Sequence, residues 1–386
     1  IAAEAVNALI FNGSREAFLT VNQLAAKCKF RQIKNAAGRT LSQAAAQLGI
    51  SREELEDSMV PDLGFDRRME RQLDFGSRHF TVRLTESMEL EIFDSDGKRR
   101  KSLPAPGKQD DAEKAQQAAA ELKQLKKQLK NVISTQKLRL EQALRTGRFW
   151  QREKWTELFV QNPVMHAFAT GLIWGVYDQQ GMLKDSFRYM EDGSYNRADG
   201  NEYEPGAMTA REEGTIGLVH PLELTREDLA LWKEQLSEYE ISQPIAQLER
   251  PVYRFAEEET EEMAVTRFEN RELDGLVLSA KLLSAGWVRG KILDAGFFNS
   301  YYRIDGRFGA ELTFSGASVG YESGEVTVEH LYFYRFPDNI GDGGDLERFR
   351  RENRCRPEDI SPRYYSEVVM EIAGMAEERH SQLPPV

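Results

Sequence analysis

The chain has 386 residues and a mass of 44.1 kDa, enough for two or three domains with ordinary hydrophobic cores. Its 51 Lys and Arg against 63 Asp and Glu give a formal net charge of −12. With 40% hydrophobic and 30% charged residues, the composition is that of a globular protein, which excludes the disordered and fibrous classes. No apolar stretch reaches the roughly 18–20 residues that cross a bilayer, so we expect no membrane partner. Two cysteines, Cys28 and Cys355, exclude a disulfide framework and a cysteine-based zinc cluster, and they suit a cytoplasmic location.

An N-terminal helical part is predicted for residues 1–66. Apolar residues recur there at three- and four-residue spacing, and Ser51 with Glu54 forms a capping-box pair that marks a helix start. Because the apolar pattern is already under way at Ile1, we expect this sequence to be a fragment of a longer polypeptide.

Residues 41–55 resemble a DNA-binding helix-turn-helix, with Gly49 at the turn position and Leu55 as the apolar anchor. The second helix, however, carries four acidic residues against Arg52 alone. DNA binding depends largely on the neutralisation of phosphates, which this acidic face would repel. We therefore predict a structural helical hairpin, and we do not expect nucleic acid to bind through this fragment.

Residues 67–108 are predicted to form a small β-meander, because apolar residues alternate along two runs that turn residues separate. Residues 109–168 are predicted to contain a long helix from 110 to about 148, followed by a second helical stretch that includes Trp150 and Trp155. The long helix has nine Lys and Arg against five Asp and Glu. We interpret this basic excess as a solvated face, with contact to a partner helix or to nucleic acid as the alternative.

A mixed α+β domain is predicted for residues 169–386. Residues 170–220 and 298–336 alternate in the manner of strands, a helix is expected from near Thr225, and Ser361 followed by proline marks the start of a final helix. The fold class predicted for the whole chain is α+β. It comprises an N-terminal helical part, a small β-meander, a long helix, and then a mixed part with a largely antiparallel sheet packed by helices.

The sequence contains no motif that identifies a catalytic or metal centre. Its five histidines do not approach zinc-ligand spacing, and no nucleophile elbow is present. The glycine loop at residues 340–345 lacks the lysine of a P-loop, and we interpret it as an acidic surface loop, with adventitious cation binding as the alternative. The acidic run at 257–262 is interpreted as a solvated helix start or loop. We predict no cofactor and no metal.

A set of polar residues lies beside aromatic or apolar neighbours, so partial burial of these side chains is expected. The set comprises Arg188, His220, Gln243, Arg250, Arg289, Asp294 and Glu367. An unpaired buried charge costs several kcal/mol, so the charges must be neutralised. One interpretation is an arginine–carboxylate network that holds two subdomains together without any ligand. The alternative is a pocket in which the three arginines bind an anionic ligand, with the acids or the histidine as acid–base partners.

Several short runs, taken together in their order and spacing, resemble one bacterial domain. The runs are residues 54–57 with 60–64, 73–78, 103–106, 136–143, 220–222, 239–253 and 366–368. In these runs the chain is similar to the uncharacterised domain found toward the C-terminus of MolR-type proteins, the molybdate metabolism regulators, which is often found with WGR domains. The resemblance implies a regulatory role and assigns no catalytic or binding residue. A WGR motif itself is not visible, since Val176 follows Trp174 and Gly175.

Two functional hypotheses follow. The first is a non-catalytic regulatory or scaffold module that acts through protein–protein contacts, either with a protein partner or with other domains of a longer parent chain. The second is an enzyme or sensor that binds an anionic ligand, an oxyanion or a nucleotide, in the arginine-rich pocket. The sequence leaves open whether the chain is an enzyme.

Overall fold

The computed structural model of the chain describes residues 5, 15–28, 30–204, 214–255, 263–320, 322, 324–336 and 352–380. The chain divides into two compact units. The first comprises residues 1–141, 149–219 and 225–247, and the second comprises residues 142–148, 220–224 and 248–386. The glycine loop at 340–345 and the acidic run at 257–262 lie outside the described residues. The division of the chain into four parts at 1–66, 67–108, 109–168 and 169–386 stays a prediction.

The described part of the first unit opens with helices α2 (Arg15–Lys27), α3 (Arg31–Leu48) and α4 (Arg52–Ser58). Helix α3 ends where Gly49 takes a left-handed φ of 70°, which glycine adopts at little cost. Helix α4 begins after Ser51, whose hydroxyl accepts from the Glu54 amide while the Glu54 carboxylate accepts from the Ser51 amide. The predicted helical hairpin and its capping box are therefore confirmed.

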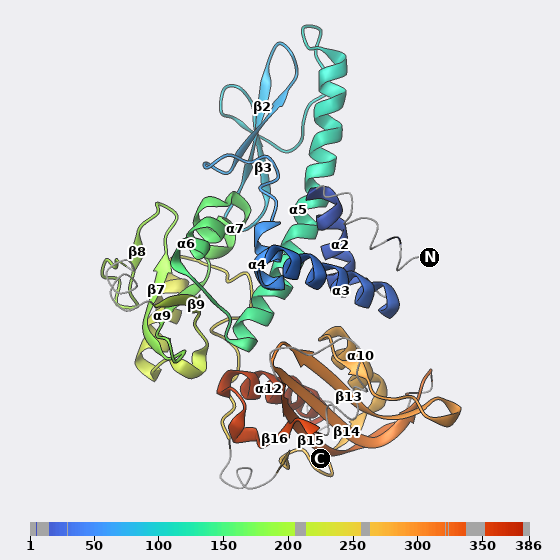
Figure 1. Cartoon of the computed structure of the whole chain (residues 1–386). Helices are drawn as coiled ribbons and strands as arrows, with labels where there is room; N and C mark the ends of the chain where they lie inside the picture. The colour runs from blue at the N-terminus through green and yellow to red at the C-terminus, as the bar shows by residue number, and fades with distance from the viewer. Residues whose placement is uncertain are drawn as a thin grey trace. The chain divides into compact units, whose positions relative to one another are not determined.

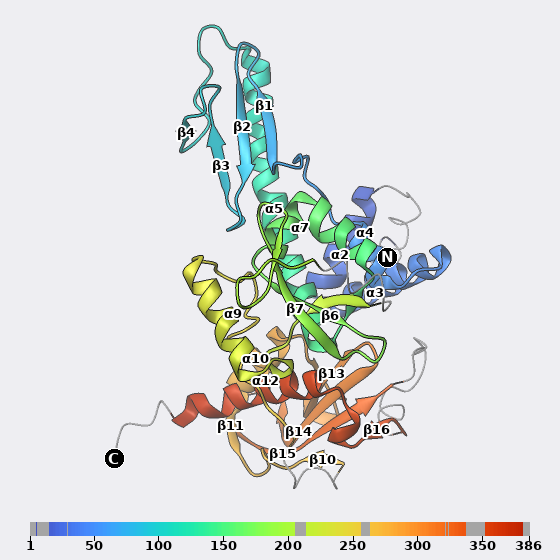
Figure 2. The ribbon, with the colours of Figure 1, turned by 90° about the vertical axis from the view of Figure 1, so that its left-hand side faces the viewer.

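A four-stranded antiparallel meander follows, in the order β1-β2-β3-β4. Its strands are β1 (Glu70–Asp74), β2 (His79–Leu84), β3 (Leu90–Phe93) and β4 (Arg99–Arg100). The meander lies beside the N-terminal half of helix α5 (Ala112–Thr146), as Figures 1 and 2 show. An ion pair of 3.1 Å between Arg71 and Glu121 joins the two elements. The predicted strands and the predicted long helix are confirmed.

The first unit also contains a five-stranded antiparallel sheet with an aromatic core, in the order β5-β9-β6-β7-β8. Its strands are β5 (Phe149–Trp150), β6 (Ile173–Tyr177), β7 (Leu183–Tyr189), β8 (Tyr195–Asn196) and β9 (Thr215–Leu218). Helix α6 (Arg152–Trp155) continues as a π-helical stretch, Thr156–Gln161, and helix α7 (Pro163–Ala169) follows. The prediction of Trp150 in a helix is wrong. Trp150 pairs with Ile216 across the sheet, and its ring packs against Phe159 and Trp174, so tertiary burial decides its backbone conformation.

Helix α9 (Arg226–Glu238) begins where predicted, because the Thr225 hydroxyl accepts from the Asp228 amide. After this helix the fully buried side chain of Gln247 reaches the sheet. Its amide oxygen accepts from the Ile173 amide at 2.9 Å, and its amide nitrogen donates to the carbonyls of Ile173 at 2.7 Å and Val219 at 2.9 Å. One side chain thus satisfies three buried backbone groups.

The second unit is built on an antiparallel sheet with the order β10-β15-β14-β13-β12, in which β11 and β16 also pair with β15. The strands are β10 (Ala264–Val265), β11 (Glu272–Asp274), β12 (Val288–Arg289), β13 (Phe297–Asp305), β14 (Phe308–Ser318), β15 (Glu325–Arg335) and β16 (Arg354–Cys355). Helices α10 (Gly275–Ser284) and α12 (Pro362–His380) pack against this sheet (Figure 2). Their apolar faces share one core with inward-facing strand residues such as Tyr301, Leu312 and Leu331.

The α+β class predicted from the sequence is confirmed by these helices and antiparallel sheets. The final helix begins at Pro362, directly after Ser361, as predicted. Among the described residues, no helix combines the length and the apolar character needed to cross a membrane.

The Gln247 side chain gives a first test of the fold. We expect Gln247→Ala to lower the free energy of unfolding by about 3 kcal/mol, because the Ile173 amide and the Val219 carbonyl lose their side-chain partner and each costs about 1–3 kcal/mol. The Ile173 carbonyl keeps the bond that it accepts from the Val219 amide at 3.1 Å. Urea unfolding followed by tryptophan fluorescence measures this loss. Gln180→Ala is the matched control, because Gln180 is exposed and its removal should change stability by less than about 0.5 kcal/mol. An equal loss in the two variants would contradict the role assigned to Gln247.

Candidate functional site

The structure divides the seven residues of the predicted site between the two units. Arg188 and Gln243 belong to the first unit. The other five belong to the second unit: His220, Arg250, Arg289, Asp294 and Glu367. Within the second unit, three of them meet in one contact cluster, namely His220, Arg250 and Glu367.

Glu367 of α12 is at the centre of this cluster. One carboxylate oxygen lies 3.1 Å from Nε2 of His220, and the other accepts from Nη1 of Arg250. All three residues are buried, with exposed fractions of 2%, 0% and 7% for Glu367, His220 and Arg250. His220 precedes a 3₁₀ turn at Pro221–Glu223, so a residue next to a turn is brought against the helix.

The hydrogen bonds of His220 fix its tautomer. The backbone amide of Leu222 donates to Nδ1 at 3.1 Å, so Nδ1 must be the acceptor. The ring proton therefore lies on Nε2, which donates to Glu367. Both ring nitrogens are used by the protein itself, which makes the ring a cap for the turn and a donor to a carboxylate. A histidine in this arrangement has no nitrogen left to take a proton from a substrate.

The charge of Glu367 is held in the ionised form by its neighbours. Burial alone raises the pKa of this carboxyl, but the hydrogen bond from His220 and the charge of Arg250 outweigh it and hold the pKa below its ordinary value of 4.5. The carboxylate and the guanidinium thus compensate each other in a site that is closed to solvent.

A second cluster, absent from the sequence analysis, lies between α12 and the sheet. Arg303 donates through Nη1 to Glu371 of α12 at 2.7 Å, and its Nε lies 2.8 Å from Asp305. Arg145 lies 3.2 Å from the same Asp305 carboxylate. Trp287 Nε1 also donates to Glu371, at 2.7 Å. Burial raises the pKa of Asp305, but the charges of Arg145 and Arg303 outweigh it, so the pKa is lowered overall.

A third pair connects α12 to the turn that follows His220. Both Nε and Nη2 of Arg363 donate to the two oxygens of Glu223, each at 2.6 Å, which is the bidentate geometry of a strong arginine–carboxylate pair. Nη1 of Arg363 donates to the carbonyl of Leu144 at 3.3 Å. The backbone amide of His220 donates to Glu223 as well. This pair therefore ties three segments of the second unit to one another.

These contacts form one set that we call the α12 charge network. It comprises Arg145, His220, Glu223, Arg250, Arg303, Asp305, Arg363, Glu367 and Glu371. Arg363, Glu367 and Glu371 lie four residues apart and so share one face of α12. Four guanidinium groups meet four carboxylates, and the histidine is neutral in the tautomer deduced above. The network is thus balanced in charge by the chain's own side chains.

Arg289 and Asp294 do not take part in this network. Nη2 of Arg289 donates to Glu322 at 2.6 Å, and its guanidinium lies 5.5 Å from the centre of the Phe298 ring. The backbone of Asp294 begins a 3₁₀ turn, Asp294–Gly296, and its side chain is exposed. Within the second unit, the structure brings neither residue into the cluster around Glu367.

Arg188 lies fully buried in the first unit. Its Nη2 donates to Glu191 at 2.9 Å, its Nε donates to the Thr170 carbonyl at 3.2 Å, and the ring of Tyr239 lies 5.0 Å away. Burial lowers the pKa of this guanidinium. Nη1 is buried and has no hydrogen-bond partner among the residues that the structure describes. Nε of Arg289 in the second unit is likewise buried without a hydrogen-bond partner among the described residues, so each of these two nitrogens is a feature of the predicted site that a ligand could complete.

Gln243 has an ordinary structural role in the first unit. Its amide nitrogen donates to the Gly171 carbonyl at 3.3 Å and to the amide oxygen of Gln247 at 3.0 Å. It therefore helps to orient the Gln247 side chain, which bonds the sheet backbone.

Cys355 offers little nucleophilic chemistry. Burial raises the pKa of the Cys355 thiol to about 12, so the thiolate that acts as a nucleophile is scarce at neutral pH. Among the described residues, no three His, Cys, Asp or Glu side chains come together in a way that could hold a metal ion.

The structure thus defines an α+β protein whose second unit is joined by a buried, charge-balanced network. Residues 97–287 match the family model described as "Domain of unknown function (DUF4132)". The chain is also similar to the uncharacterized protein YehI of Escherichia coli (strain K12), with 33% identity over 316 residues. This match covers 81% of the chain but 25% of YehI, so the chain spans about a quarter of that relative's length. No solved structure matches significantly. An uncharacterised domain family is thereby supported.

Removal of one member of the network should destabilise the protein. We expect Glu367→Ala to lower the free energy of unfolding by about 3–5 kcal/mol, because Arg250 stays buried without its carboxylate. Chemical denaturation measures the change. Glu329→Ala is the control, since Glu329 is exposed on β15 of the same unit and should cost less than about 0.5 kcal/mol. A loss below about 1 kcal/mol in Glu367→Ala would show that the pair is not a structural constraint.

The lowered pKa of Glu367 predicts a pH dependence of stability. A carboxyl whose pKa is lower in the folded state stabilises the fold fully above its unfolded pKa, and this contribution is lost as the pH falls. We therefore expect stability to decrease as the pH falls below about 4.5, the ordinary value, toward the lower folded value. Denaturation midpoints measured from pH 7 to pH 3 test this, and Glu367→Gln should show a shallower decrease. An identical pH profile in the variant would contradict the assignment.

Proposed function

We propose that this chain is a non-catalytic regulatory or scaffold module that acts through protein–protein contacts. The observation that carries the proposal is the α12 charge network. The site that most resembles an acid–base centre, His220 with Glu367 and Arg250, is occupied by its own hydrogen bonds. Its buried charges are balanced, so it holds the second unit together without requiring a guest.

The resemblance to MolR-type proteins supports the regulatory part of this proposal. The relatives found by comparison carry no functional description, and the match to YehI covers a quarter of that protein. A module of this kind would bind a partner protein and so connect it to other domains of a longer parent chain. The connection with molybdate metabolism and a cytoplasmic location belong to the same proposal.

The alternative is an enzyme or sensor that binds an anionic ligand, an oxyanion or a nucleotide, at an arginine. The buried Nη1 of Arg188 favours this, because an anion would supply the acceptor that is missing among the described residues. The surrounding charges weigh against it. Burial, together with the negative charge of Glu191, raises the pKa of Glu86, so this region already holds two carboxylates near one guanidinium. An added anion would meet that repulsion, which makes this the second candidate.

A ligand screen separates the two functions. We expect thermal unfolding in the presence of molybdate, phosphate, ATP or magnesium to show no shift in Tm, because a scaffold has no site for these probes. A ligand at about 100 times its Kd would add about 2.7 kcal/mol, which raises Tm by about 3 °C in a chain of this size. A shift of that size that Arg188→Met abolishes would overturn the scaffold proposal. The exposed Arg152→Met is the control for a nonspecific loss of positive charge.

A further inference from the structure

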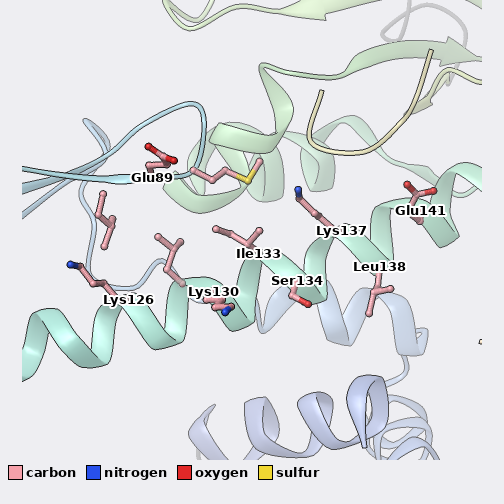
Figure 3. Close-up of a pocket in the computed structure, with 11 residues that line it drawn as sticks. Glu89, Lys126, Lys130, Ile133, Ser134, Lys137, Leu138 and Glu141 are labelled. Carbon is pink, nitrogen blue, oxygen red and sulfur yellow. The ribbon is translucent and has the colours of Figure 1, made fainter. Parts of the chain in front are cut away.

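The first unit has a groove that the network does not explain. It lies between helix α5 and the turn that joins β2 to β3, and its volume is about 680 Å³ (Figure 3). The residues that line it come from two short stretches. They are Met88, Glu89 and Leu90 from the meander, and Lys126, Leu129, Lys130, Ile133, Ser134, Lys137, Leu138 and Glu141 from α5.

The floor of the groove is apolar. Leu129 is buried and Ile133 is half-buried, and the two lie four residues apart on one face of α5. Leu138, which is 51% exposed, lies on another face of the helix and points away from Ile133 (Figure 3). Met88 and Leu90 extend this apolar surface from the side of the meander. Apolar side chains grouped along one face of a helix are suited to receive the apolar face of another helix.

Three lysines border this floor. Lys126, Lys130 and Lys137 lie on α5 at spacings of four and seven residues, which place them along one side of the helix (Figure 3). Within the described residues, none of the three forms an ion pair or a hydrogen bond. Other basic residues of α5 differ from them, because Lys114 is paired with Asp74 and Arg139 with Glu56. Lys123 and Lys127 of α5 likewise form no ion pair among the described residues, but they do not line the groove, so the three groove lysines differ from them by their place beside the apolar floor.

The charge of the groove selects the partner. Three lysines face two carboxylates, Glu89 and Glu141, so the border is basic although the chain as a whole has a net charge of −12. From Lys126 to Glu141 the helix rises about 22 Å, close to the length of four helical turns. A partner helix of that length, with carboxylates beside an apolar stripe, could place those carboxylates opposite the three lysines of α5.

We propose that the groove between α5 and the β2–β3 turn binds an acidic amphipathic helix of a partner protein. The apolar stripe of that helix covers Met88, Leu90 and Ile133, and its carboxylates pair with Lys126, Lys130 and Lys137. The inference rests on the proposed function, because it names the surface through which a scaffold module makes its protein contact.

The test uses the full chain and a labelled probe. The probe is a fluorescein-labelled peptide of about 16 residues with leucines at helical spacing on one face and glutamates on the others. We expect saturable binding by fluorescence anisotropy, with affinity that decreases as salt is added because the lysines are exposed. Lys130→Glu and Ile133→Ser should each weaken binding by about tenfold or more.

Matched controls make the result specific. Lys123→Glu and Lys127→Glu change exposed lysines of the same helix that do not line the groove, and they should leave affinity within about twofold. A peptide of the same composition with its leucines scattered should bind at least about tenfold more weakly. Circular dichroism confirms that each variant is folded.

The opposite results overturn the inference. They are the absence of saturable binding, an equal loss in the control variants, or displacement of the peptide by duplex DNA or phosphatidylserine vesicles with the same dependence on Lys130. If the peptide does not bind and the ligand screen shows no shift in Tm, only the assignment of the groove as the docking surface is wrong. If the screen shows an Arg188-dependent shift, the scaffold proposal is wrong whatever the peptide does.

Discussion

Helix α12 can lie on its sheet only because each charge on its buried face meets an opposite charge. Arg363, Glu367 and Glu371 follow one another at four-residue spacing, and the desolvation of any one of them would cost several kcal/mol without its partner. Their partners come from three separate stretches of the chain, 142–148, 220–224 and 248–305. The network therefore joins distant pieces of sequence into one unit, with the apolar core of α12 and the sheet beside it.

Much of the architecture could be predicted, because the periodicity of apolar residues is a local signal. The long helix was expected from 110 to about 148 and runs from Ala112 to Thr146, and capping residues located α4, α9 and α12. Trp150 is the informative failure. It was predicted in the same helical stretch as Trp155, but burial against the rings of the five-stranded sheet requires an extended backbone. This requirement comes from tertiary packing in the folded core, so the residues next to Trp150 in the sequence do not indicate it.

The candidate site was less predictable, because its contacts join residues far apart. His220, Arg250 and Glu367 were selected for their apolar neighbours, but their sequence separations of 147 and 117 residues hide which of them meet. Arg303, Asp305 and Glu371 were missed. A usable signal existed, since Arg303 and Asp305 lie two residues apart on the inward face of β13, where a charge requires compensation. Two sides of α5 show the same contrast, with Arg139 compensated within the fold and Lys130 left to solvent.

The composition of the second unit has a consequence for dissecting the molecule. The chain passes between the units at five points, after residues 141, 148, 219, 224 and 247. A recombinant fragment that began at Leu248 would keep Glu367, Glu371 and Arg363 while losing Arg145, His220 and Glu223. Truncation at what looks like a natural boundary would expose orphaned charges in the remaining piece, so the functional parts of this chain are better separated by point substitution than by cutting.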